Sequence, residues 1–155
     1  EIECHLQKMG SPESPFKLIG AKQVGKGGMA AMRMMYLLRQ TLKDKIAFWP
    51  FDHKEKIDRA KIVVTEIYPR LFIKKAGFGL SKITDYHQIS HVLNFYDVFL
   101  FQPGEYSDHQ ADAIISAAGI KHYLSREGLT HTHNPRIQIE GWILGVQPNT
   151  PFQKE

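Results

Sequence analysis

The sequence contains a single cysteine, Cys4, in 155 residues. An internal disulfide is therefore impossible, which is typical of proteins from a reducing compartment. No apolar run approaches the roughly 20 residues that a membrane-spanning helix requires. The first ten residues carry charges throughout, unlike a secretory signal peptide. From these absences we expect a cytoplasmic protein with no membrane partner.

Acidic residues are scarce in the first part of the chain. Residues 1–82 hold 16 Lys and Arg against 8 Asp and Glu, a balance of +8, whereas residues 83–155 hold 4 against 8, a balance of −4. This asymmetry suits a metal-binding region beside a phosphate-binding surface. A chance asymmetry on an ordinary solvated surface explains it equally well.

Helical and extended segments alternate along the chain. We predict helices over 29–43, 70–76, 84–101 and 107–124, and strands over 45–49, 61–68 and 136–146. Loop, turn or irregular structure is expected over 1–20, 20–28, 51–60 and 147–155. Segment 61–68 has the near-continuous apolar run of a central strand covered on both faces. Strands interleaved with helices predict an α/β fold in one domain covering 1–155.

Two of the predicted helices have distinctive sequences. Four of the five methionines lie in 29–43, where gap-filling core positions are favoured over an adaptable partner surface. At the start of the last helix, Ser107 and Gln110 have the spacing of a capping box. Gly128 marks the expected end of that helix.

Three carboxylates are candidate metal ligands. Glu66 lies within the most apolar strand, where a carboxylate must be paired, protonated or bound to a cation. It could instead lie at the exposed end of that strand, or pair with Arg70 or a lysine. Asp108 and Asp112 are four residues apart, so they share one helix face and repel each other unless a cation lies near them. Asp108 also suits the first turn of a helix, whereas Asp112 stands among alanines and isoleucines. Such oxygen ligands favour Mg²⁺ or Mn²⁺ over zinc.

Other polar residues give weaker signals. His131 and His133 form an isolated H-x-H loop without the further ligands that zinc requires. His109 could orient Asp108 or face solvent. The glycines of 25–28 could cradle a phosphate at a helix N-terminus, although an ordinary entry loop is favoured because the P-loop pattern is missing. Basic residues that could contact nucleic-acid phosphates are Lys22, Lys26, Arg33, Arg70, Lys74 and Lys75.

Several segments, taken in order, resemble one family. Segment 64–69 is similar to the "E-Y-P" strand of predicted RNase H-like nucleases, a group catalogued as a domain of unknown function, number 429. Segment 108–117 resembles its "D-x-x-D-A" helix and 140–146 its closing segment. The helix is also similar to the last acidic helix of RuvC-type resolvases. The resemblance implies a mixed sheet flanked by helices, and a Mg²⁺- or Mn²⁺-dependent nuclease using Glu66, Asp108 and Asp112.

One part of the family pattern is missing. Its members open with a strand that carries a first catalytic aspartate, and no Asp precedes Asp44 here. We therefore expect a C-terminal portion of an RNase H-like domain, completed by an N-terminal segment or another chain, or else an incomplete site. The alternative functions are a non-catalytic module that binds nucleic acid, a nucleotide or a protein, and an interaction subunit that uses the methionine-rich helix.

Overall fold

The computed structural model describes residues 19, 24–79, 82–99, 102–129, 137 and 141–146. These residues form two compact units. The first contains residues 19, 24–66, 137 and 141–142, and the second contains 67–79, 82–99, 102–129 and 143–146. Five α-helices and a two-stranded parallel sheet lie in the described part of the chain, which confirms a mixed α/β fold.

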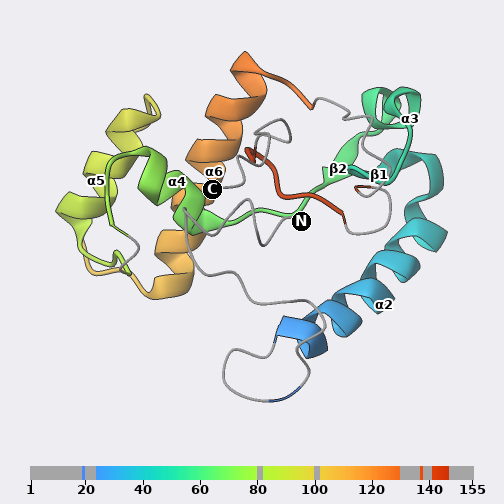
Figure 1. The fold of residues 1–155 in the computed structure, drawn as a ribbon, viewed down its shortest axis with the longest axis horizontal. Helices are drawn as coiled ribbons and strands as arrows, with labels where there is room; N and C mark the ends of the chain where they lie inside the picture. Colours follow the sequence, from blue (N-terminus) through green and yellow to red (C-terminus); the bar gives the residue numbers. More distant parts are fainter. Residues whose placement is uncertain are drawn as a thin grey trace, which may run out of the picture. The chain divides into compact units, whose positions relative to one another are not determined.

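The first unit is built around a short parallel strand pair (Figure 1). Its elements are α2 (Val24–Leu42), the 3-10 turn η1 (Lys43–Lys45), β1 (Ile46–Phe48), α3 (Lys54–Arg59) and β2 (Ile62–Val64). Strand β1 is fully buried and pairs with β2 in a register that sets Ile46 opposite Ile62. Both α2 and α3 contact β1, so this strand is the centre of the unit.

Helix α2 begins earlier than the sequence predicted. Residues 24–28 are helical, although their glycines had indicated a loop. Each of the three glycines costs about 1 kcal/mol relative to alanine, about 3 kcal/mol in all, which the other residues of this 19-residue helix outweigh. The expected inner stripe is confirmed in part, because Met35, Leu38 and Leu42 are half-buried whereas Ala31 is exposed.

The core interpretation of the methionines is wrong for three of the four in this helix. The side chains of Met29, Met32 and Met34 are exposed. Tyr36 and Leu37, on the same helix, are exposed as well. Apolar residues therefore occur on nearly all sides of α2, and the sequence pattern alone could not identify which side faces the unit.

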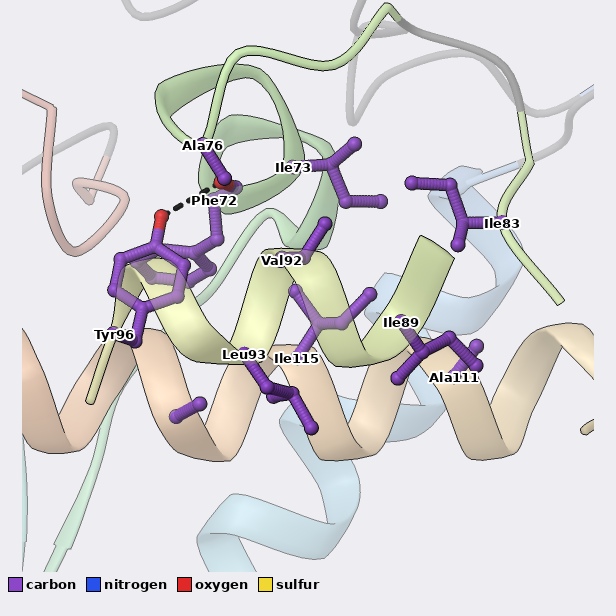
Figure 2. Packing of buried hydrophobic residues seen from close by; sticks show 11 residues of the cluster. Phe72, Ile73, Ala76, Ile83, Ile89, Val92, Leu93, Tyr96, Ala111 and Ile115 are labelled. Atoms are coloured by element: carbon purple, nitrogen blue, oxygen red, sulfur yellow. Dashed lines mark hydrogen bonds between the residues drawn. The ribbon is translucent and has the colours of Figure 1, made fainter. Parts of the chain in front are cut away.

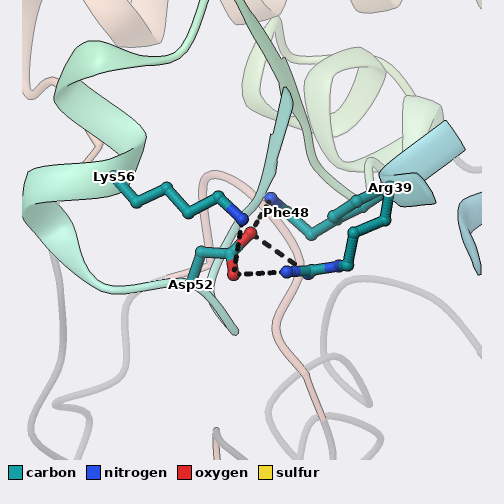
Figure 3. A network of polar contacts seen from close by, with 4 residues as sticks. All are labelled: Arg39, Phe48, Asp52 and Lys56. Atoms are coloured by element: carbon teal, nitrogen blue, oxygen red, sulfur yellow. Dashed lines mark hydrogen bonds and ion pairs between the residues drawn. The ribbon is translucent and has the colours of Figure 1, made fainter. Parts of the chain in front are cut away.

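A polar network fastens α2 to the turn that follows β1 (Figure 3). The Arg39 guanidinium donates to both carboxylate oxygens of Asp52, over 2.8 and 3.1 Å, and its Cζ lies 4.8 Å from the centre of the Phe48 ring. The Phe48 amide donates to Asp52 over 2.8 Å, and Lys56 Nζ lies 3.6 Å from the same carboxylate. Burial alone would raise the pKa of Asp52, but these donors and charges together lower it below its ordinary value.

Two extended segments differ from their predictions. Strand β2 has three residues rather than eight, and Ile62 is 47% exposed, so segment 61–68 is not a strand covered on both faces. A parallel strand gains most of its stability from neighbours on both sides, and among the described residues only β1 pairs with β2. Of the strand predicted over 136–146, residues 136 and 138–140 lie outside the described residues, Ile137 is helical, and 141–146 contain a single bridge position at Ile143. Segment 51–60 contains α3, which was missed.

The second unit consists of three helices around one apolar core. They are α4 (Pro69–Lys75), α5 (Tyr86–Phe95) and α6 (Asp108–Arg126), and both α4 and α5 contact α6 (Figure 1). All three match predicted helices, although α5 is shorter than expected. Ile89, Val92 and Leu93 of α5 pack with Phe72 of α4 and Ile115 of α6 (Figure 2).

The contact between α4 and α6 depends on a glycine. A Cβ at Gly119 would lie 2.3 Å from Phe72 Cδ1, far closer than side chains approach one another. Phe72 is held in place because Tyr96 Oη donates to its carbonyl over 2.6 Å and the two rings pack edge to face (Figure 2). The glycine therefore sets how closely the two helices approach.

In the part of the chain that the structure describes, no helix combines the length and the apolar content needed to span a bilayer. The segments expected to be irregular, 1–20 and 147–155, lie outside the described residues apart from Ile19.

Candidate functional site

The two aspartates predicted as ligands lie in the first two turns of α6. Ser107 precedes the helix, and its Oγ accepts a hydrogen bond from the backbone amide of Gln110 over 3.3 Å. In return, Oε1 of the Gln110 side chain accepts one from the backbone amide of Ser107 over 2.9 Å. This reciprocal pair is the predicted capping box and is confirmed. Ser107, rather than Asp108, therefore supplies the cap. Asp108 and Asp112 lie on one face of the helix, where an i, i+4 pair has its Cβ atoms about 6 Å apart.

A pocket of about 190 Å³ opens beside these aspartates, entirely within the second unit. Its lining residues are Arg70, Ile73, Lys82, Ile83, Asp108, His109 and Asp112. The apolar members, Ile73 and Ile83, are 2% and 4% exposed, so the charged groups gather beside the apolar core. The volume is below the roughly 300–1,000 Å³ of pockets for drug-sized ligands, and it suits an ion, a phosphate group or a few waters.

The acidic side of the pocket faces basic side chains. Lys82 Nζ donates to Asp108 Oδ2. Arg70, on the first turn of α4, is exposed and lines the same pocket. Carboxylates are the hard oxygen ligands of Mg²⁺ and Mn²⁺, and guanidinium and ammonium groups are the usual partners of phosphate. The pocket therefore holds acidic and basic side chains side by side.

Backbone pairing between the segment before α5 and the segment before α6 explains why Lys82 lies close to α6. Asp85 and Glu105 form an antiparallel bridge, and the Tyr106 amide donates to the Thr84 carbonyl over 3.3 Å. These contacts place the segment before α5 alongside the segment before α6. Sequence reasoning missed Lys82 as a site residue, because it lies 26 positions from its partner and no local pattern connects the two.

Glu66 lies in the first unit, two residues beyond the end of β2. The residue as a whole is exposed, yet burial raises the pKa of its carboxyl above the ordinary value. A raised carboxyl pKa is common at functional sites and also at purely structural positions. The structure therefore brings together Asp108 and Asp112 within one unit, and the participation of Glu66 stays a prediction.

The residues predicted to contact phosphates have different environments. Arg70 lines the pocket, whereas Lys75 Nζ donates to the Gly145 carbonyl over 2.9 Å, and burial lowers the pKa of that amine. Lys26 and Arg33 lie on the exposed side of α2 in the first unit. Of the remaining predicted contacts, Lys74 is half-buried and Lys22 lies outside the described residues, as do His131 and His133.

Among the residues that the structure describes, no three His, Cys, Asp or Glu side chains gather closely enough to hold a metal ion. Mg²⁺ is often held by only one or two carboxylates, with water and substrate phosphate completing its coordination. The aspartate pair on α6 fits that mode of binding, since both acids line one pocket beside cations able to hold a phosphate.

Comparison of the chain with protein-family models, curated proteins and solved structures found no significant match. The function therefore has to be inferred from the residues and their geometry.

Proposed function

We propose that the chain hydrolyses phosphodiester bonds of nucleic acid at the α6 pocket, as a nuclease related to the RNase H-like group. The supporting observation is that one pocket is lined by two carboxylates, Asp108 and Asp112, and by two cations, Arg70 and Lys82. Mg²⁺ or Mn²⁺ bound to such carboxylates supplies an activated water and charge stabilisation at the reacting phosphate. Glu66 is proposed as a further ligand.

The protein residues have distinct roles in this proposal. Asp108 and Asp112 hold the cation, and the capping box of Ser107 and Gln110 fixes the start of the helix that carries both. Arg70 holds a non-bridging phosphate oxygen, a role suited to its planar, permanently charged guanidinium. The apolar neighbours Ile73 and Ile83 belong to the buried core and form the apolar part of the pocket lining.

The proposal is tested with Asp112→Asn, which removes one anionic ligand and keeps the size of the side chain. Asp112 is exposed, so this variant should retain the fold and its unfolding temperature. Cleavage of an oligonucleotide in Mg²⁺ or Mn²⁺ should fall at least 100-fold and be absent in EDTA. Asp97→Asn is the matched control, because Asp97 is exposed, lies outside the pocket and has a φ of 55°, which asparagine accepts readily. Unchanged cleavage by Asp112→Asn would refute the assignment.

The Lys82–Asp108 ion pair favours a second function, a non-catalytic module that binds nucleic acid. With that ion pair formed, the negative charges of two acidic side chains and the positive charges of two basic ones already cancel in the pocket. A module of this kind would bind an oligonucleotide equally well in EDTA and in Mg²⁺, and would leave it intact. Equal binding in both conditions without cleavage would therefore support the module over the nuclease.

A further inference from the structure

Residues 26–34 of helix α2 are exposed one after another, over more than two turns of the helix. A helix that packs on its own unit buries a residue every three or four positions, and Met35 and Leu38 are half-buried in this way further along α2. A Cβ at Gly27 or Gly28 would meet nothing within 4 Å. Segment 26–34 therefore packs against no element of the part of the chain that the structure describes.

Large apolar side chains project from this side of the molecule. Met29, Met32 and Tyr36 are 46%, 59% and 64% exposed. Their spacings of three and four residues place them on one stripe of α2. Exposed apolar side chains that gather in this way mark contact surfaces, and methionine suits surfaces that adapt to a protein partner. The α6 pocket lies in the other unit, so the proposed nuclease activity leaves this stripe unused.

Two cations follow one edge of the stripe. Helix α2 contains no acidic residue, and its pitch places Lys26 and Arg33 on one side, next to the apolar stripe. The third cation of α2, Arg39, is held by Asp52, whereas no carboxylate of the described residues pairs with Lys26 or Arg33. A partner that complements this surface is therefore apolar along one line and acidic beside it.

Other occupants match fewer of these features. A second copy of the chain would bring the same cations against each other, which disfavours pairing of two α2 helices. Nucleic acid would pair with the cations, but its phosphates gain nothing from exposed methionines. Helices that lie on a membrane surface carry mainly Trp, Phe or Leu on their apolar face, while this stripe has two methionines and a tyrosine. Another protein is the occupant that uses both the apolar stripe and the charge.

We propose that α2 is the docking surface for an acidic amphipathic helix of another protein. The apolar face of that helix packs on Met29, Met32 and Tyr36, and its carboxylates pair with Lys26 and Arg33. This interaction is independent of the proposed nuclease activity, because the aspartates of the pocket lie in the second unit.

Two synthetic peptides of about 18 residues, long enough to form a helix, test the charge complementarity. Both have leucines three or four positions apart and alanines elsewhere, and the positions beside the leucines are glutamates in one peptide and lysines in the other. Binding to the whole chain is measured by calorimetry. The glutamate peptide should bind with a Kd of about 10–100 µM, a weak affinity that suits a small surface. The lysine peptide should bind about tenfold more weakly, from the loss of two exposed ion pairs.

Charge reversal tests the cations directly. Lys26→Glu combined with Arg33→Glu should make the chain prefer the lysine peptide. Arg59→Glu combined with Lys61→Glu is the matched control, because both residues are exposed, lie in the same unit outside α2 and change the net charge equally. The control should keep the preference for the glutamate peptide.

Met32→Gln tests the apolar stripe, since glutamine keeps the length of the side chain and its helix propensity. The loss of apolar contact should weaken binding of the glutamate peptide about fivefold or more. Met34→Gln is the matched control, because Met34 is 57% exposed but lies on the opposite side of α2. It should bind the peptide as the wild type does, and the two variants should unfold at the same temperature.

The outcomes distinguish this docking surface from its alternatives. No binding of the glutamate peptide, equal affinity for both peptides, or an equal loss in Met32→Gln and Met34→Gln would overturn the proposal. A chain that dimerises in sedimentation, or binds vesicles of phosphatidylcholine and phosphatidylglycerol, would overturn it too if Met32→Gln abolished that association, since a second copy or a membrane would then occupy the stripe. Asp112→Asn should bind the peptide as the wild type does, so failure of the nuclease proposal leaves this one standing.

Discussion

Gly119→Ala is the substitution whose effect the structure defines most sharply. The added methyl carbon would lie 2.3, 2.5 and 2.7 Å from three ring carbons of Phe72. The ring cannot withdraw, because Phe72 is 1% exposed, its carbonyl accepts from Tyr96, and its ring packs against that of Tyr96. Relief of the overlap therefore requires α4 and α6 to separate.

Two opposing effects set the magnitude. Overpacking of a buried site costs about 3 kcal/mol at the upper end of its usual range, and this contact is severe. Replacing a helical glycine by alanine returns about 1 kcal/mol. We therefore expect the free energy of unfolding to fall by about 2 kcal/mol, from the difference between these terms. Because α4 carries Arg70 and α6 carries both aspartates, the same variant should also disturb the pocket on which the proposed metal and oligonucleotide binding depend.

Urea unfolding followed by far-ultraviolet circular dichroism measures the change. Gly27→Ala is the control, since Gly27 also lies in a helix but a Cβ there would meet nothing within 4 Å. That variant should be more stable than the wild type by up to about 1 kcal/mol. The double variant Gly119→Ala with Phe72→Leu should lose less stability than the sum of the two single losses, because the two side chains share one contact. A Gly119→Ala variant as stable as Gly27→Ala would show that the reasoning on helix spacing is wrong.

Two further predictions concern the hydrogen-bonded carboxylate of Asp52 and the N-terminal cap of α6. The pKa of Asp52 is lowered in the folded protein, so its contribution to stability is present above the pKa of the unfolded chain and is lost as pH falls through the folded value. Asp52→Asn should therefore lower the free energy of unfolding by about 1–2 kcal/mol at pH 7, and by clearly less near pH 2.5. Urea titrations at the two pH values measure this difference. An equal loss of stability at both would contradict the prediction. Ser107→Ala removes the cap of α6 and should cost about 1 kcal/mol, measured as a lower thermal midpoint, whereas no change would show that the capping box adds nothing.

Local signals predicted helices well and strands less well. The capping residues Ser107 and Gln110 located the start of α6, and Gly128, with a φ of +67°, follows the end of α6 as expected. Helix α3 was missed because its six residues contain one buried apolar side chain, Ile57, which gives no periodic pattern. The extent of β2 was overestimated, since strand length depends on pairing partners that a local apolar run does not reveal.

The candidate site was predictable only where its residues are close in sequence. The spacing of Asp108 and Asp112 set them on one helix face, and the structure lines one pocket with both. Arg70 was predicted as a phosphate contact, but its place beside the acids follows from the packing of α4 on α6. The position of Lys82 beside Asp108 follows from backbone pairing between the segments before α5 and α6, a non-local feature that composition and periodicity do not encode.

The capping box also separates the start of α6 from the acids of the pocket. Because Ser107 and Gln110 begin the helix by themselves, neither aspartate is needed to form it. Under the proposed function, replacing either acid by its amide would remove a metal ligand and leave the start of the helix intact. The capping box would then keep the fold independent of the residues on which the proposed activity depends.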